Sequence, residues 1–294
     1  MKGALAELER LARNPTVPIL IEGETGTGKT MVARHLHEIS PRAAGPFAHV
    51  MLAGLDDSLA NSDLFGHVPG AFTGALGLRK GIFASAQHGT IFFDEIGKAS
   101  RAVQQKLLTA IEQREIRPVG SDCIMHVDTR VIAASNVPLA DAVAAGEFLP
   151  DLYARIRTFR VTIPPLRKRR ADIPLLVERF VAEHIREDGA ADVPTVSAEL
   201  MHAFVTADWP HNVRELSATI QWLLIAADGA AELTLDHCRG PLSWLVAGEE
   251  PGPLTAEQAE RALAEANGNV SQAARILGKD RSTLYRALHR PTGD

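Results

Sequence analysis

The chain has 294 residues, of which 46% are hydrophobic and 23% are charged, and its formal net charge at pH 7 is −5. This balance is that of an ordinary globular protein, and it excludes disorder, collagen and coiled coil as the main architecture. The 36 acidic residues against 31 basic ones also exclude a protein that is basic throughout and wraps nucleic acid along its whole length, but they leave room for a local basic patch.

The first 164 residues alternate between helical and strand-like patterns. Leucines at 5, 8 and 11 predict a helix over 4–13, and the apolar run Val17–Ile21 predicts a strand. Further along, helices are expected over 31–39 and 102–112, and strands over 90–93 and 129–134. Because strands that alternate with helices are typical of a parallel sheet, we expect an α/β subdomain over 1–164.

The rest of the chain has a mostly helical pattern. Helices are expected over 173–186, 198–206 and 213–227 with little strand signal between them, which predicts a small helical subdomain over 165–240. The segment 241–253 is rich in Gly, Pro and Glu and is predicted to be a linker. Thr255 and Gln258 have the spacing of a capping box, so a last helical unit is expected over 254–294.

A glycine-rich segment after the first strand matches the pattern GxxxxGK[ST] of a phosphate-binding loop. Its glycines let backbone N–H groups converge on phosphate oxygens, and the N-terminus of the following helix favours negative charge. Lys29 would reach the β- and γ-phosphates of a nucleotide, and the Thr30 hydroxyl would bind Mg²⁺. The predicted binding loop consists of Gly23, Glu24, Thr25, Gly26, Thr27, Gly28, Lys29 and Thr30.

Polar side chains follow two of the predicted strands. Asp94 and Glu95 come directly after the strand over 90–93, and acids in that position fall beside the phosphate-binding loop in such sheets. Asp94 would hold Mg²⁺ through water, and Glu95 would polarise the attacking water. Asn136 follows the strand over 129–134 and has two interpretations, as a sensor of the γ-phosphate or as an ordinary cap at the end of the strand.

The segment between these motifs resembles a known family. Leu64-Phe65-Gly66-His67 and Gly70-Ala71-Phe72-Thr73-Gly74-Ala75 resemble the GAFTGA region of bacterial enhancer-binding proteins, the AAA+ ATPases that activate sigma-54 RNA polymerase. The resemblance covers nearly the whole chain, with further matches in family order at Gly89–Ile96, Asp151–Tyr153, Pro165–Arg167, Asp172–Leu176, Trp209–Pro210 and Asn212–Leu216.

The resemblance implies an α/β AAA+ P-loop core with a parallel sheet, followed by a helical lid subdomain and a C-terminal helix-turn-helix. It implies a hexameric ring that binds ATP and Mg²⁺ between subunits. A loop formed by Gly70–Ala75, with Phe72 and Thr73 at its tip, would engage sigma-54, and hydrolysis would remodel the closed promoter complex into an open one. Arg155 matches the arginine finger that reaches a neighbour's γ-phosphate, and Arg214 matches the sensor-II arginine that ties nucleotide state to the lid. The implied catalytic residues are Lys29, Asp94, Glu95 and Arg155.

Two of the departures from the family pattern bear on catalysis. The family usually carries an Asn on the second strand that restrains the catalytic glutamate, but here Met51 occupies that position, and a thioether cannot donate a hydrogen bond. Leu149 stands where relatives often have a second arginine. These departures suggest an alternative, a DNA-binding regulator that does not hydrolyse ATP and in which ATP controls only assembly. The intact GAFTGA loop argues against this alternative, because the loop acts in the family through movements that ATP hydrolysis drives.

The last unit resembles the Fis-type helix-turn-helix that ends many enhancer-binding proteins. A helix is expected over 267–278 and a second helix over Arg281–His289, and residues 275–290 carry five basic residues and one acid. Basic side chains can pair with DNA phosphates, and the second helix can enter the major groove. The predicted partner is therefore double-stranded DNA at an upstream site, contacted by Arg281, Ser282, Thr283, Tyr285 and Arg286.

The remaining signals concern location and regulation. Cys123 and Cys238 lie far apart without a metal-type spacing, which favours a reducing compartment. No apolar run approaches the roughly 20 residues of a membrane span, so we expect a cytoplasmic protein that does not contact a membrane. No separate regulatory domain precedes residue 15, so either another protein supplies regulation or the chain is a truncated product.

Overall fold

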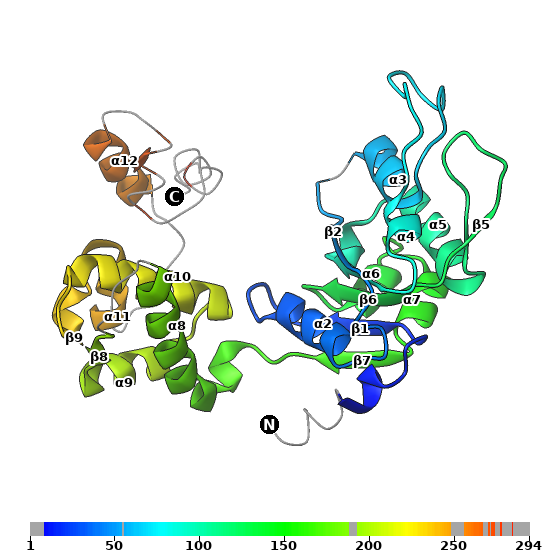
Figure 1. The fold of residues 1–294 in the computed structure, drawn as a ribbon. Helices are drawn as coiled ribbons and strands as arrows, with labels where there is room; N and C mark the ends of the chain where they lie inside the picture. Colours follow the sequence, from blue (N-terminus) through cyan, green and yellow to red (C-terminus); the bar gives the residue numbers. More distant parts are fainter. Residues whose placement is uncertain are drawn as a thin grey trace. The chain divides into compact units, whose positions relative to one another are not determined.

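The computed structural model describes residues 9–54, 56–187, 193–247 and 256–266, together with residues 270, 272, 273, 277 and 284. The chain divides into two compact units, Met1–Pro165 and Leu166–Asp294 (Figure 1). None of the described helices is long and apolar enough to cross a membrane.

The first unit is built on a five-stranded sheet in which every pairing is parallel. The parallel α/β sheet predicted from the sequence is therefore confirmed. Its edge strands, β2 and β7, are only partly buried, and they lack the continuous apolar run that is typical of a central strand. In spatial order the strands are β2 (Phe47–Met51), β3 (Thr90–Asp94), β6 (Arg130–Ser135), β1 (Ile19–Glu22) and β7 (Phe159–Thr162).

Helices cover both faces of this sheet. Alternate residues of a strand point to opposite faces, and Ile19 and Ile21 belong to a core with helix α2 (Lys29–Glu38), whereas Leu20 belongs to a second core with α5 (Arg101–Glu112) and α7 (Pro150–Ile156). Residues 9–12 are helical, and the start of the predicted helix over 4–13 lies outside the described residues. The other elements of this unit are α3 (Asp57–Phe65), α4 (Ile82–Ser85), η1 (Ile96–Lys98), β4 (Glu115–Ile116), β5 (Met125–His126) and α6 (Leu139–Ala144).

His37 is a buried polar residue of α2 that faces strand β3. Its Nδ1 lies 2.9 Å from the Thr90 hydroxyl, and burial lowers the pKa of the imidazole below its ordinary 6.5. The unfolded chain therefore takes up a proton on His37 at higher pH than the folded chain. The contribution of neutral His37 to the free energy of unfolding is complete above pH 6.5 and is lost as the pH falls below 6.5. We expect the wild-type chain to lose more unfolding free energy than His37→Gln between about pH 7.5 and about pH 5.5, as measured by urea unfolding. Equal losses in the two chains would contradict this assignment.

The second unit begins with a helical subdomain packed around Trp209. This side chain is completely buried, and its Nε1 donates a hydrogen bond to the carbonyl oxygen of Phe204 at 2.8 Å. The three helices predicted from the sequence are present as α8 (Ile173–Glu187), α9 (Ala198–Thr206) and α10 (Asn212–Ala227). A short parallel pair, β8 (Thr195–Val196) and β9 (Glu232–Leu233), was not predicted. The 3₁₀ segments are η2 (Leu166–Lys168), η3 (Arg170–Asp172), η4 (Leu235–His237) and η5 (Gly240–Leu242).

The structure differs from the predicted linker over 241–253. A helix, α11 (Ser243–Ala247), occupies its first part, and Leu242 and Leu245 are buried in the core of the helical subdomain. The Gly and Pro residues of this segment are typical of a turn or linker, so the sequence pattern did not identify the two core leucines between them. Residues 248–253 lie outside the described residues.

The last part of the chain contains α12 (Ala256–Glu265), which lies in the last helical unit predicted from the sequence. Its buried alanines Ala259 and Ala262 form a small apolar cluster with Ala273 and Leu284. The predicted DNA contacts Arg281, Ser282, Thr283, Tyr285 and Arg286 lie outside the described residues.

Candidate functional site

The predicted phosphate-binding loop connects β1 directly to α2. Gly28, the residue before the helix, has a left-handed backbone with φ of 100°, which only glycine adopts at little cost. Lys29 is buried, and its Nζ donates hydrogen bonds to the carbonyl oxygens of Gly23 and Glu24 at 2.7 and 3.0 Å. The loop thus curls around its own lysine ahead of a helix N-terminus, which is the arrangement that binds phosphate.

Glu22, which the sequence reasoning missed, fixes the strand that carries this loop. The residue is buried, and its carboxylate accepts a hydrogen bond from the Leu139 backbone N–H at 2.9 Å and pairs with Arg160 on β7. A buried carboxylate is expensive unless it is paired and hydrogen-bonded, and both conditions are met here. Glu22 therefore ties the end of β1 to α6 and β7.

The structure brings Thr30 next to the Asp94-Glu95 pair, although Thr30 is far from these two residues in the sequence. Thr30 Oγ1 lies 3.5 Å from Asp94 Oδ2, and the Glu95 backbone N–H donates to Asp94 Oδ1 at 3.1 Å. Glu95 has a left-handed backbone with φ of 54°, an uncommon conformation for a residue with a side chain and one that is concentrated at functional sites.

These oxygen atoms fit a magnesium ion. Mg²⁺ prefers oxygen ligands, and it usually keeps several waters and is held by one or two carboxylates together with substrate phosphates. Thr30 and Asp94 supply a hydroxyl and a carboxylate, and no cluster of three or more His, Cys, Asp or Glu side chains that could cage a metal occurs among the described residues. A hydroxyl and one carboxylate leave the other positions around such an ion to water and to the phosphates of a nucleotide.

Two further strands place residues beside these acids. Asn136 is half-buried at the end of β6, the strand between β1 and β3. On β2, Met51 is paired in register with Asp94 and its side chain is 51% exposed. His49 Nε2 lies 3.5 Å from Asp94 Oδ2. The sequence reasoning missed His49, although its spacing of two from Met51 placed it on the same face of the strand.

The segment 66–81 forms a projecting loop. His67 pairs with Arg79 in an antiparallel bridge at the base of the loop, and Val68 N–H donates to the Val119 carbonyl oxygen at 3.1 Å. The neighbouring hairpin of β4 and β5 projects from the same end of the unit (Figure 1). At Gly120 of that hairpin, a Cβ atom would come within 2.7 Å of the Ala71 Cβ. The loop and the hairpin are therefore packed together.

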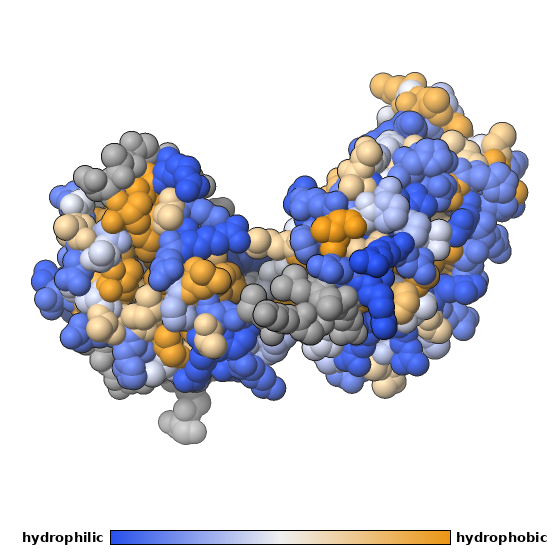
Figure 2. Space-filling model, turned by 60° about the horizontal axis from the view of Figure 1, so that its bottom comes forward, coloured by the Kyte–Doolittle hydropathy of each residue, from blue (hydrophilic) through white to orange (hydrophobic). Residues whose placement is uncertain are grey.

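The most exposed apolar side chains of this loop lie outside Gly70–Ala75. Phe72 is 36% exposed because its ring packs edge-on against the buried His67, with the ring centroids 5.0 Å apart. Leu76 and Leu78 are 97% and 76% exposed, and Figure 2 shows hydrophobic surface at the projecting end of this unit. Two leucines beyond the motif had given no signal in the sequence reasoning, because spacing alone does not reveal whether a loop side chain finds a neighbour.

The two arginines singled out by the resemblance lie in different units. Arg155 lies in the last turn of α7, and its Nε is 3.1 Å from Glu112 Oε1 at the end of α5. Arg214 is exposed in the first turn of α10. Leu149, the residue before α7, packs against the core, and its backbone N–H donates to Gln104 Oε1 at 2.8 Å.

Comparison with known proteins decides the family. Residues 1–162 match the family model of the Sigma-54 interaction domain. The chain belongs to this family. Two further family models match later parts of the chain, the AAA+ ATPase lid domain over 167–242 and the bacterial regulatory protein, Fis family, over 257–290. The family resemblance and the fold class drawn from the sequence are thereby confirmed.

Similar proteins include several bacterial regulators. The nitrogen fixation protein VnfA of Azotobacter vinelandii is 42% identical over 92% of this chain and 53% of its own length. The transcriptional regulatory protein ZraR of Salmonella typhimurium is 40% identical over 99% of this chain and 67% of its own length. The chain thus spans about half to two thirds of the length of these relatives. Among solved structures, NtrX from Brucella abortus in complex with ADP has a TM-score of 0.75 at 26% identity and covers 98% of this chain and 67% of its own.

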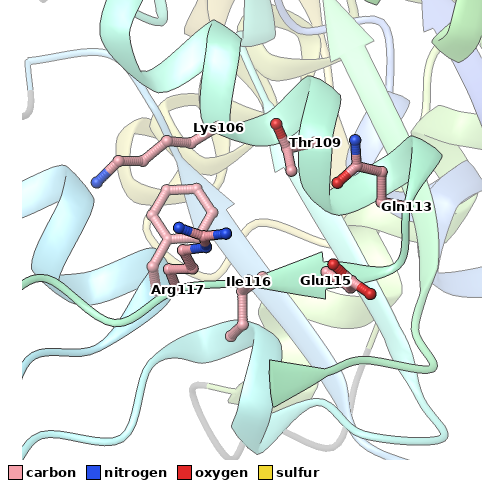
Figure 3. A pocket seen from close by; sticks show the side chains of 7 residues that line it. Lys106, Thr109, Gln113, Glu115, Ile116 and Arg117 are labelled. Carbon is pink, nitrogen blue, oxygen red and sulfur yellow. The ribbon is translucent and has the colours of Figure 1, made fainter. Parts of the chain in front are cut away.

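The first unit also contains a cavity of about 380 Å³ that shares no residue with the phosphate-binding loop. The Lys106 ammonium lies over the Phe65 ring, 5.3 Å from its centroid, and desolvation lowers the pKa of this lysine below its ordinary value. Figure 3 shows side chains of α5 and β4 around the cavity. The lining residues are Phe65, Lys106, Thr109, Gln113, Glu115, Ile116 and Arg117.

Proposed function

We propose that the chain is an ATP-hydrolysing activator of sigma-54 RNA polymerase. The observation that carries the proposal is the presence, in one α/β unit, of a phosphate-binding loop beside Asp94 and Glu95 and of a projecting loop with exposed apolar side chains. A site that releases energy and a surface that can touch a partner are the two parts that a remodelling ATPase needs.

In this proposal each residue of the nucleotide site has a distinct role. The backbone N–H groups of Gly23–Thr30 and the Lys29 ammonium bind the phosphates, and Glu95 orients and polarises the attacking water. Thr30 and Asp94 hold Mg²⁺, which neutralises developing charge on the phosphate oxygens. Asn136 contacts the γ-phosphate, and Arg214 contributes from the lid.

The site is completed in the proposal by a neighbouring copy of the chain in a hexameric ring. Arg155 is exposed on the surface of its own unit, so its charge is available to stabilise the transferring phosphoryl group on the neighbour. We propose that the ring forms in the cytoplasm and that the Fis-type unit holds it at an upstream DNA site through Arg281, Ser282, Thr283, Tyr285 and Arg286.

The partner surface met by the loop is proposed to be apolar. Gly70–Ala75 contact sigma-54, and the exposed Leu76 and Leu78 extend this contact beyond the motif. When a partner covers apolar side chains that were exposed to water, the free energy of the complex falls by about 25 cal/mol per Å² of buried apolar surface.

One observation favours a second candidate, a DNA-binding regulator that binds ATP without hydrolysing it. Met51 stands in register with Asp94, where its thioether can donate no hydrogen bond to Glu95. In this alternative ATP binding would control assembly alone.

The rate of Mg²⁺-dependent ATP hydrolysis per subunit, measured against protein concentration, separates these candidates. We expect the rate to climb with concentration, because the site is completed in trans, and to be absent in Lys29→Ala at every concentration. ATP binding without hydrolysis above the Lys29→Ala blank would reject the first candidate and support the second.

A further inference from the structure

The side chain of Arg155 has one polar partner among the described residues of its unit. Its Nε lies 3.1 Å from Glu112 Oε1, and the two side chains are 52% and 38% exposed. No other side-chain partner of Arg155 occurs among the described residues. An ion pair this exposed adds little to the stability of the fold, so its effect is on where the guanidinium points.

The contact leaves most of the guanidinium available. Arginine has five N–H donors in a rigid planar fork, of which one is on Nε and four are on the two terminal nitrogens. Glu112 accepts from Nε. The four terminal N–H groups, which suit two oxygens of a phosphate, remain available for a ligand outside the unit.

Both partners lie on elements that are fixed by buried contacts. Leu152 and Ile156 bury one face of α7 completely. The buried Gln104 of α5 accepts from the Leu149 N–H at the start of α7 and donates to the carbonyl oxygens of Ala99 and Glu147, at 2.8 and 3.0 Å. Because α5 and α7 are joined in this way, the position of Glu112 relative to Arg155 is set by the fold.

We propose that Glu112 is a positioning residue that holds Arg155 extended toward the γ-phosphate of ATP bound by a neighbouring copy of this chain. This inference rests on the proposed function, since it requires a site completed in trans. Without the carboxylate the guanidinium would sample many rotamers, and only a fraction would present its terminal nitrogens to the phosphate. Glu112→Ala is therefore expected to lower kcat by about fivefold, and to leave KM for ATP within about twofold, because the subunit that binds ATP does so with its own loop.

A mixture of two inactive variants tests this inference at one interface. Lys29→Ala has an intact Arg155 and a dead site, and Arg155→Ala has an intact site and no arginine, so mixed rings contain active interfaces only where the first variant faces the second. Adding Glu112→Ala to the Lys29→Ala subunit should lower the activity of the mixture about fivefold. Adding it to the Arg155→Ala subunit should change nothing, because that subunit has no arginine to position.

Each outcome is decisive. Equal losses in both placements would assign Glu112 a structural role and overturn the inference, as would no loss in either. If the mixture of Lys29→Ala and Arg155→Ala had no activity, the trans site would be rejected, and the inference with it. Two further measurements test the specificity of the effect. Glu112→Gln should retain most activity, since its amide oxygen can still accept a hydrogen bond from Nε. Assembly promoted by a non-hydrolysable ATP analogue, followed by sedimentation, should weaken in Glu112→Ala but not in the control Glu183→Ala, which breaks an exposed ion pair with Arg179.

Discussion

Replacement of Glu95 by Gln is expected to lower the rate of ATP hydrolysis by at least about a hundredfold while ATP binding is retained. The amide keeps the size of the side chain but cannot take up the proton of the attacking water. The backbone geometry that aims the residue should survive, because the left-handed turn is held by the Glu95 N–H bond to Asp94. Steady-state hydrolysis and the binding of a fluorescent ATP analogue measure the two effects separately.

A matched control for this substitution is Glu38→Gln. Glu38 is an exposed glutamate at the end of α2, and its replacement should leave hydrolysis within about twofold of wild type. If Glu95→Gln kept more than about a tenth of the wild-type rate, another group would have to activate the water. The half-buried Asn136 and the His49 imidazole beside Asp94 would then be the next residues to replace.

The second large effect is expected at the projecting loop. Thr73→Ala should leave ATP hydrolysis within about twofold of wild type and lower sigma-54-dependent open-complex formation by at least about tenfold. Thr73 is exposed on a loop that packs against the β4–β5 hairpin rather than the nucleotide site, so its truncation leaves the chemistry intact. Permanganate footprinting of the melted promoter, run beside a hydrolysis assay, measures both quantities.

The leucines beyond the motif give this prediction a graded form. Leu76→Ser and Leu78→Ser should each weaken binding of the ring to sigma-54 with hydrolysis unchanged. Leu175→Ser makes the same replacement at a 64% exposed leucine on α8, and it should change neither sigma-54 binding nor ATP hydrolysis. Unimpaired open-complex formation in Thr73→Ala would reject the loop as the partner surface, whereas a normal Leu76→Ser beside a defective Thr73→Ala would confine the contact to the motif.

The motifs that carry the chemistry are short and continuous, so the sequence reveals them directly. A phosphate-binding loop needs glycines and a lysine at fixed spacing, because consecutive N–H groups surround one phosphate. Asp94 and Glu95 follow a short apolar run that is typical of a buried strand. The alternation of strands and helices, and hence the parallel sheet, follows from the same local patterns.

Tertiary contacts decide the features that join residues distant in the sequence. The residue pattern did not reveal the edge strands β2 and β7 or the helix α11, because half-exposed strands and two leucines between Gly and Pro residues have no distinct period; the family resemblance alone placed Met51 on a strand. The approach of Thr30 to Asp94 depends on strand order in the sheet, which no local pattern encodes.

The sequence by itself therefore predicted which side chains bind phosphate, activate water and form the projecting loop, because each set is contiguous. Only the tertiary structure decided how these side chains are held and exposed. Glu112 meets Arg155 because α5 packs on α7, and Phe72 is half-covered by His67 while Leu76 stands free. Burial and pairing depend on which residues are neighbours in space. Folding brings these neighbours together from distant parts of the chain, and the spacing of residues in the sequence does not show which parts will meet.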